Sequence, residues 1–265
     1  MKVGWAASYF EPIGSLGGGA EIADSIWIRG GEELGFQVSK LEEKDSFSGF
    51  DLLIVSNIRT FSKETIDHLV KEKFVYINHD IGGFEHRSLL LEKSILNIFL
   101  SPLHKSLFKD DGKSIIVPNP FLIENYYSGI KIKNSCVYAG VVGKYKGHDN
   151  VVEYAKQHLD MNFEIIGIHR DITPCSLPNV KYTEKYLSQK ELIKKLSIAE
   201  YFIHLPQYIE AFGRTVAEAF LCGCKLICND QVGFLSFPWS NDIKLVKEKL
   251  GNSRQDFWKE IERVI

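Results

Sequence analysis

Short apolar runs alternate with longer segments of helical periodicity along the whole chain. In the first half, apolar runs predict strands at 2–7, 51–56, 74–78, 96–100 and 114–117. In the second half they predict strands at 136–140, 163–167, 201–205 and 225–228. Helical patterns lie between them, beginning near residues 20, 62, 149, 188 and 213. Strands that alternate with helices favour parallel sheets covered by helices, so the chain is predicted to have an α/β fold.

The alternation is interrupted once, by a polar stretch without clear period at 126–135. We therefore expect two α/β domains, at 1–130 and 131–265. The last predicted helix, 253–265, carries apolar residues at helical spacing and is expected to pack through that face.

Composition narrows the class of protein. Apolar residues make up 45% of the chain, enough for sizeable cores, and the formal net charge of -2 gives no bulk attraction to nucleic acid or anionic lipid. No run approaches the roughly 20 apolar residues of a membrane span, and the N-terminus is strand-like, so a cytoplasmic location is expected. The five cysteines lack metal-ligand or disulfide-framework spacing. Without an Asp-x-Asp motif or a His/Cys cluster, neither a metal nor a cofactor is expected.

Two glutamates flank a glycine where a predicted strand and loop lead into a helix. Glu210 and Glu218 lie on either side of Gly213, and the amides from Gly213 to Thr215 fall in the first helical turn. These amides have no partner within the helix and can donate to a phosphate or sugar oxygen. Carboxylates accept pairs of hydrogen bonds from vicinal hydroxyls. The segment therefore favours a phosphorylated, hydroxyl-rich ligand.

Further candidate residues follow other predicted strands. A glycine run, Gly17 to Gly19, connects the first strand to the first helix, where the absence of side chains lets backbone amides approach a bound oxygen. The alternative for this run is a flexible turn. His79 directly follows the strand at 74–78, at the sheet edge where ligands gather in α/β proteins. It could equally be a loop histidine without a ligand.

The segment 210–218 resembles the E-x7-E signature of retaining glycosyltransferases with the GT-B fold, in the large group that uses nucleotide-activated sugars. Phe212-Gly213 and the run 218–223 follow the same pattern, and an apolar strand at 225–228 follows where the family has one. The resemblance implies two Rossmann-like domains with parallel sheets that face each other across a cleft. It also implies that the second domain binds most of the donor and that the last helix packs back on the first.

The resemblance assigns roles to these residues. Glu210 is expected to contact the transferred sugar, Glu218 the ribose of the nucleotide, and His79 the donor sugar. The remaining expected donor contacts are Phe212, Gly213, Thr215, Gly140, Lys144, Gly18 and Gly19.

The loop after the strand at 136–140 departs from the family pattern at one position. Lys146 matches a lysine that neutralises the diphosphate, whereas Val141 stands where the family has an arginine. A diphosphate leaving group carries at least two negative charges, so a second cation is expected, from Arg214 or Lys144. Arg214 is favoured because its planar guanidinium grips phosphate oxygens in pairs. A solvated basic loop is the alternative for Lys144 and Lys146.

The resemblance implies metal-independent transfer of a sugar from a nucleotide-sugar donor to an acceptor hydroxyl, with retention of configuration. The acceptor is left open among glycans, lipid-linked sugars, small molecules and hydroxymethylated bases in DNA of the phage type. For nucleic acid, Lys105, Lys109 and Lys113 with Phe108 between them are one candidate surface, with a solvated helix face as the alternative. A nucleotide-sugar epimerase of GT-B fold and a non-catalytic nucleotide-sugar-binding protein are the other candidate classes.

Overall fold

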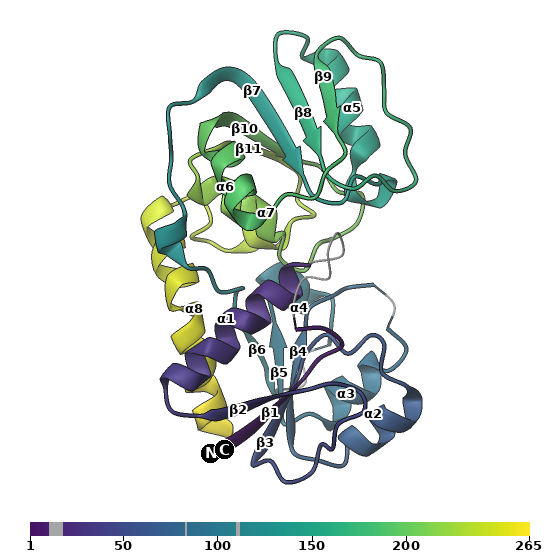
Figure 1. The fold of residues 1–265 in the computed structure, drawn as a ribbon, viewed down its shortest axis with the longest axis vertical. Helices are drawn as coiled ribbons and strands as arrows, with labels where there is room; N and C mark the ends of the chain where they lie inside the picture. The colour runs from purple at the N-terminus through teal and green to yellow at the C-terminus, as the bar shows by residue number, and fades with distance from the viewer. Residues whose placement is uncertain (11–17, 83, 110–111) are drawn as a thin grey trace. The chain divides into compact units, whose positions relative to one another are not determined.

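The protein forms two compact units. The structure is a computed structural model that describes residues 1–10, 18–82, 84–109 and 112–265. Unit 1 contains Met1–Phe121 and Glu248–Ile265, and unit 2 contains Leu122–Lys247. In each unit helices cover a sheet whose described strand pairings are all parallel (Figure 1), which confirms the predicted α/β fold.

The sheet of unit 1 has the strand order β2-β1-β3-β4-β5-β6. Its strands are β1 (Lys2–Ala6), β2 (Gln37–Leu41), β3 (Leu52–Val55), β4 (Phe74–Asn78), β5 (Leu96–Phe99) and β6 (Ser114–Ile116). The helices between them are α1 (Gly19–Glu33), α2 (Lys63–Leu69), α3 (Arg87–Lys93) and α4 (Pro102–Ser106). The last helix of the chain, α8, spans Ile243–Val264.

Successive strand residues point to opposite faces of the unit 1 sheet, and each face has its own cover. On one face Trp5 lies 5.7 Å from the ring of Phe257 on α8, which stacks at 4.9 Å on Trp27 of α1. On the other face Leu53 packs in one buried cluster with Ile66 of α2. Figure 1 shows α1 and α8 on one side of this sheet and α2 and α3 on the other. Both faces are buried, which explains the near-continuous apolar runs of these strands.

The sheet of unit 2 has the strand order β11-β10-β7-β8-β9. Its strands are β7 (Ile132–Ala139), β8 (Asn162–Ile166), β9 (Val180–Thr183), β10 (Ala199–His204) and β11 (Lys225–Cys228). Its helices are α5 (His148–Gln157), α6 (Gln189–Ile198) and α7 (Arg214–Leu221), with short 3-10 turns at Ile123–Asn125, Lys144–Lys146 and Gly233–Ser236.

Local sequence signals explain where the helices of unit 2 begin. The Ser188 side chain accepts from the Glu191 amide, and the Glu191 carboxylate accepts from the Ser188 amide, as the predicted capping box requires. The predicted helix at 253–265 is the second part of α8, which starts earlier because the Asp242 carboxylate accepts from the amides of Lys244 and Leu245. In the described ranges, no helix combines the length and apolar character needed to cross a membrane.

Candidate active site

The segment between β10 and α7 is held in a bent conformation by a glycine. Gly213 adopts φ +81°, in the left-handed region, and a Cβ atom there would lie 2.6 Å from the side chain of Val232. The backbone of Glu210 is fixed on both sides, since its amide donates to Gln231 and its carbonyl accepts from Gly233. Another residue at position 213 would therefore force the first turn of α7 away from Glu210.

Glu210 is the centre of a cluster of charged side chains in unit 2. Its Oε1 lies 2.6 Å from Nζ of Lys146 and 3.0 Å from Nε2 of His204. Burial alone would raise the pKa of Glu210, but His204 and Lys146 outweigh it and lower the pKa to about 2. The carboxylate is therefore ionised at neutral pH and ready to accept hydrogen bonds.

A second glycine brings Lys146 to this cluster. Lys146 ends the 3-10 turn Lys144–Lys146, and Gly147 follows with φ +83°. A Cβ atom on Gly147 would lie 1.8 Å from the carbonyl oxygen of Leu205, so only glycine allows this loop to approach the end of β10 so closely. Lys144 is exposed in the same turn, and Gly140 follows β7 with φ +141°.

Glu218 lies in a buried polar group one and a half turns into α7. Its Oε1 is 3.4 Å from Nε of Arg214 and 3.3 Å from the hydroxyl of Tyr126, which also accepts from Gln189 at 2.9 Å. Glu218 is 3% exposed and Arg214 8%. Burial raises the pKa of Glu218 by more than Arg214 and Tyr126 lower it. Arg214 thus contacts the carboxylate expected to hold the ribose, a contact that sequence reasoning did not foresee.

The other predicted donor residues on α7 lie close by. Thr215 is half-buried in the first helical turn. The ring of Phe212 is buried, 5.8 Å from Phe234 and 6.4 Å from Phe237, so its side chain serves packing. At the position of the missing arginine, the carbonyl of Val141 accepts a hydrogen bond from the Tyr138 hydroxyl at 2.7 Å.

The predicted residues of unit 1 gather at the start of α1. Gly18 and Gly19 lead into the helix, and the Gly18 amide donates to Oε2 of Glu21 at 2.9 Å, whereas Gly17 lies outside the described residues. His79 follows β4 and places Nε2 3.1 Å from Oδ1 of Asp24 on α1. Burial lowers the pKa of His79, but the carboxylates of Asp24, Asp80 and Glu21 together outweigh it, so the pKa is raised.

Sequence reasoning missed several of these partners. His204 is the polar last residue of an apolar strand, which is a usable signal because ligands collect at the carboxyl ends of parallel strands. Tyr126 and Asp24 offered no local signal. Tyr126 is 92 residues from its partner Glu218 in the sequence, and Asp24 is 55 residues from His79. Within the described part of the chain, no three His, Cys, Asp or Glu side chains are grouped so that they could hold a metal ion.

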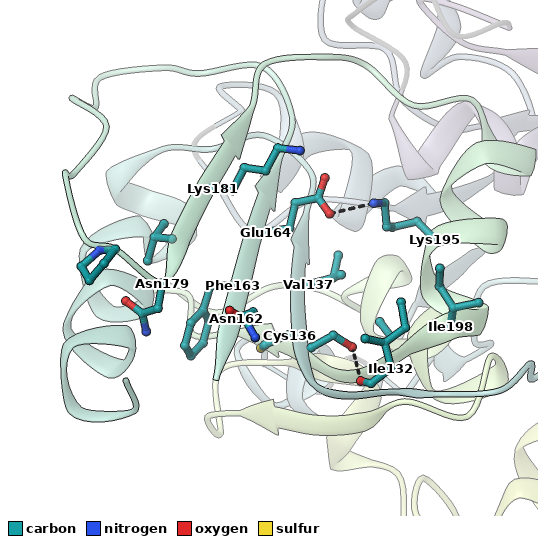
Figure 2. Close-up of a pocket in the computed structure, with 14 residues that line it drawn as sticks. Ile132, Cys136, Val137, Asn162, Phe163, Glu164, Asn179, Lys181, Lys195 and Ile198 are labelled. Atoms are coloured by element: carbon teal, nitrogen blue, oxygen red, sulfur yellow. Dashed lines mark hydrogen bonds and ion pairs between the residues drawn. The ribbon is translucent and has the colours of Figure 1, made fainter. Parts of the chain in front are cut away.

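A larger hollow in unit 2 is separate from these groups. It measures about 320 Å³ and lies over the first halves of β7 and β8, beside α6. Figure 2 shows Glu164 and Lys195 on its wall, joined by an ion pair of 2.7 Å. The Glu210 cluster instead follows the carboxyl end of β10, and no predicted site residue lines this hollow.

The Glu210 cluster leads to a prediction for acid stability. A carboxylate whose pKa is lower in the folded than in the unfolded state stabilises the fold above its unfolded pKa, about 4.5, and loses that effect as the pH falls through about 2. Thermal melts followed by circular dichroism should therefore show a steeper drop in melting temperature for the wild type than for Glu210→Gln over this range. If the melting temperatures of the two proteins fall in parallel over this range, the ion pairs of Glu210 with Lys146 and His204 are contradicted.

Part of the chain matches a known protein family, and the whole chain resembles solved structures. Residues 129–257 match the family model of Glycosyl transferases group 1, while none of the curated proteins matches the chain. Anabaena HepE in complex with UDP and glucose is 14% identical with a TM-score of 0.73, covering 99% of this chain and 100% of that one. An alpha-glucosyltransferase in complex with UDP is 12% identical with a TM-score of 0.64, covering 99% of each chain. A glycosyltransferase from Rickettsia africae is 10% identical with a TM-score of 0.70, covering 99% of this chain and 98% of that one.

At such low identities these similarities establish the fold alone. They extend over the full length of the chain, whereas the family model covers mainly unit 2, which carries Glu210 and Glu218. Residues 129–257 thus match the group 1 glycosyl transferases, and the chain has the GT-B fold.

Proposed function

We propose that the protein is a glycosyltransferase that moves a sugar from a nucleotide-sugar donor to an acceptor hydroxyl. The observation that carries the proposal is the contact of Lys146 and His204 with Glu210, next to the first turn of α7, in the segment that matches the family. We further propose that transfer proceeds with retention and without a metal ion, as the resemblance implies.

The leaving diphosphate needs positive charge around it as the glycosidic bond breaks. In our proposal the ammonium of Lys146 moves from Glu210 to the diphosphate when the donor binds. The amides of Gly213 to Thr215, at the positive end of α7, donate to the phosphate oxygens. Arg214 adds a further cation one residue into this helix, as expected from the sequence.

The two glutamates orient the rest of the donor. Once Lys146 is engaged by phosphate, the ionised Glu210 accepts hydrogen bonds from hydroxyls of the transferred sugar, with His204 still holding the carboxylate. Glu218 accepts from the ribose hydroxyls. The acceptor proton passes to the leaving phosphate in the front-face route that the resemblance implies, so no side chain is assigned as base. Holding donor and acceptor together supplies much of the rate enhancement.

The test is a nucleotide-release assay with purified protein. UDP-glucose is the first donor to try, because a similar structure holds that molecule and others hold UDP. Thermal shift with UDP and with other nucleotide sugars identifies the donor, since a ligand that binds only the folded state raises the melting temperature. NMR of the product decides retention, and activity in EDTA decides metal independence. No shift with any nucleotide sugar would refute the proposal.

The same assay separates the other candidate functions. An epimerase would convert the donor sugar without any acceptor. A non-catalytic binding protein would show the thermal shift with neither transfer nor slow hydrolysis of the donor. Transfer to an acceptor that depends on Glu210 supports the glycosyltransferase.

For the acceptor, hydroxymethylated DNA belongs in the panel with glycans, lipid-linked sugars and small molecules. One similar structure is an alpha-glucosyltransferase in complex with UDP and a 13-mer DNA, 12% identical with a TM-score of 0.62. The lysine surface considered for nucleic acid does not form one helix face, because α4 ends at Ser106. Lys105 of α4 donates to the carbonyl of Ser114 in β6, and Lys113 donates to the carbonyl of Glu92 in α3, so both ammonium groups bind backbone carbonyls within unit 1.

Replacement of Glu210 tests the sugar contact directly. Glu210→Gln keeps the size of the side chain but removes the negative charge that strengthens the hydrogen bonds accepted from sugar hydroxyls, and hydrogen bonds to charged groups contribute about 1.5 to 3 kcal/mol. We expect kcat to fall roughly tenfold to a hundredfold, with UDP affinity nearly unchanged. Steady-state kinetics and calorimetric UDP binding measure the two quantities. A loss of UDP affinity at normal kcat would mean that the roles of Glu210 and Glu218 are exchanged.

A further inference from the structure

A buried chain of hydrogen bonds in unit 1 ends at His79. The hydroxyl of Ser56, just after β3, donates to Oδ2 of Asp24 at 2.6 Å. The other carboxylate oxygen, Oδ1, lies 3.1 Å from Nε2 of His79. Ser56 is 3% exposed, Asp24 1% and the His79 side chain 5%. Three separate segments thus converge on one carboxylate that water barely reaches.

Asp24 is one of two buried acids on α1. The other, Glu21, accepts hydrogen bonds from the Gly18 amide and the Asn57 side chain, whereas Asp24 lies among packing residues. Its buried neighbours on α1 include Ala23, Ile26 and Trp27, and Trp27 stacks on Phe257. A buried carboxylate costs several kcal/mol unless hydrogen bonds and opposite charge offset the loss of water. The hydrogen-bonding partners described for it are Ser56 and His79. Packing alone would be served better by an apolar residue at this position, so the purpose of Asp24 lies in what it does to His79.

The contact fixes which nitrogen of His79 carries a proton. An ionised carboxylate only accepts hydrogen bonds, so Nε2 must be the donor toward Asp24. In the described ranges, the hydrogen bond of the His79 ring is the one from Nε2, and none involves the other nitrogen, Nδ1. His79 also lines a small hollow of unit 1 together with Asn78 and Asp80. The ring is therefore held from one side while its second nitrogen is left for a ligand.

We propose that Asp24, braced by Ser56, is a positioning residue that sets the tautomer and orientation of His79 so that Nδ1 meets a hydroxyl of the transferred sugar. The proposal rests on the proposed function and on the family resemblance, which implies that His79 contacts the donor sugar. It extends the site to Asp24, further along α1, and to Ser56, just after β3, neither of which belongs to the sequence motifs. The same arrangement of carboxylate, imidazole and freed second nitrogen orients histidines in other enzymes.

The surroundings of His79 make the effect measurable through pH. The acids around the ring are Asp24 and Glu21 on α1 and Asp80 in its own loop. The neighbouring imidazole, His104 on α4, has its pKa lowered by burial to about 3 and stays neutral. Among the described acids, Asp24 is the one hydrogen-bonded to the ring, and its charge contributes more than those of Asp80 and Glu21 to raising the pKa of His79. Removing its charge should therefore let His79 lose its proton at lower pH.

The test compares Asp24→Asn with the matched control Glu33→Gln. Glu33 also lies on α1, but it is exposed and pairs with Arg29 and Arg254. In protein with 15N-labelled histidine, NMR reports the protonation of each ring nitrogen, and His79→Gln identifies the signals. We expect Nε2–H in neutral wild-type His79. In Asp24→Asn we expect a lower titration midpoint and loss of this preference, with Glu33→Gln unchanged.

Kinetics supply the second readout. Asp24→Asn should lower kcat on the order of tenfold to a hundredfold, with donor KM little changed. The limb of the pH–rate profile that reports the titration of His79 should move to lower pH. Ser56→Ala should show a smaller effect of the same kind, and Ser56→Thr, which keeps the hydroxyl, should restore kcat.

Three results would overturn the proposal. One is an Nδ1–H tautomer in the wild type, which can be observed without any variant. The others are an unchanged titration midpoint or an unchanged kcat in folded Asp24→Asn. If the wild type transfers no sugar at all, the proposed function fails instead, while the NMR result still decides whether Asp24 positions His79.

Discussion

Lys146→Ala should lower kcat by a factor of a thousand or somewhat less, corresponding to about 3 to 4 kcal/mol of lost transition-state stabilisation. The ammonium of Lys146 lies 2.6 Å from Glu210 and is held there by the close approach of Gly147 to Leu205. After this ammonium has moved to the diphosphate of the bound donor, it needs little further reorganisation when the leaving group develops charge. Single-turnover kinetics with saturating donor isolate this step.

The matched control is Lys144→Ala, because Lys144 belongs to the same turn but is exposed. We expect nearly normal kcat for this variant. If kcat falls strongly in Lys144→Ala and stays normal in Lys146→Ala, then Lys144 supplies the positive charge of this turn. The contact between Lys146 and Glu210 would then have no catalytic role. Circular dichroism of both variants shows whether the turn itself survives the substitution.

The fold followed from periodicity wherever a strand is buried on both faces. Leu52 to Val55 and Phe74 to Asn78 are fully buried runs, and the sequence pattern located them within a residue or two. The edge strands β2 and β9 were missed because their residues are mostly exposed or half-exposed, so they lack an apolar run. The helix starts at Ser188 and Gly213 were predicted because a capping box and a glycine act through their immediate neighbours.

The candidate site was predictable only as far as single residues carry local signals. Glu210, Gly213 and Glu218 are separated by fixed short spacings, so their common position on one loop and helix could be read from the sequence. The pairing of Lys146 with Glu210 spans 64 residues and depends on how β7 and β10 lie side by side. No spacing rule reports such a contact. The same holds for Asp24 with His79, which meet because α1 packs over the carboxyl ends of β3 and β4.

Arg214 shows how the structure changes an inference from sequence. Its place beside the first helical turn suggested a partner for the diphosphate, and that role stays a prediction. The structure adds a contact with Glu218, 3.4 Å away, within a group that is almost entirely buried. Arg214 therefore also stabilises the carboxylate expected to bind ribose, so a variant at this position should alter nucleotide affinity as well as rate.

Glu218→Ala should destabilise unit 2 strongly, because it removes one partner of a buried ion pair. Breaking such a pair typically costs about 3 to 5 kcal/mol, since the remaining charge stays buried without its counterion. Burial raises the pKa of Glu218 although Arg214 and Tyr126 lower it, so burying charge at this place is costly even with its partners present. A drop in melting temperature of roughly 10 °C is expected. The surface variant Glu153→Ala, which breaks the exposed contact with Lys156, should change the melting temperature little.

The double variant Glu218→Ala/Arg214→Met separates this effect from ribose binding. With both charges gone, unit 2 should recover much of its stability, because an apolar side chain of similar length fills the site of the guanidinium. A double variant that melts below the single variant would contradict the buried-pair argument. Affinity is then measured with Glu218→Gln, which keeps the volume and can still accept from Tyr126. We expect UDP to bind it more weakly by about 1.5 to 3 kcal/mol, and unchanged affinity in the folded variant would remove Glu218 from the ribose site.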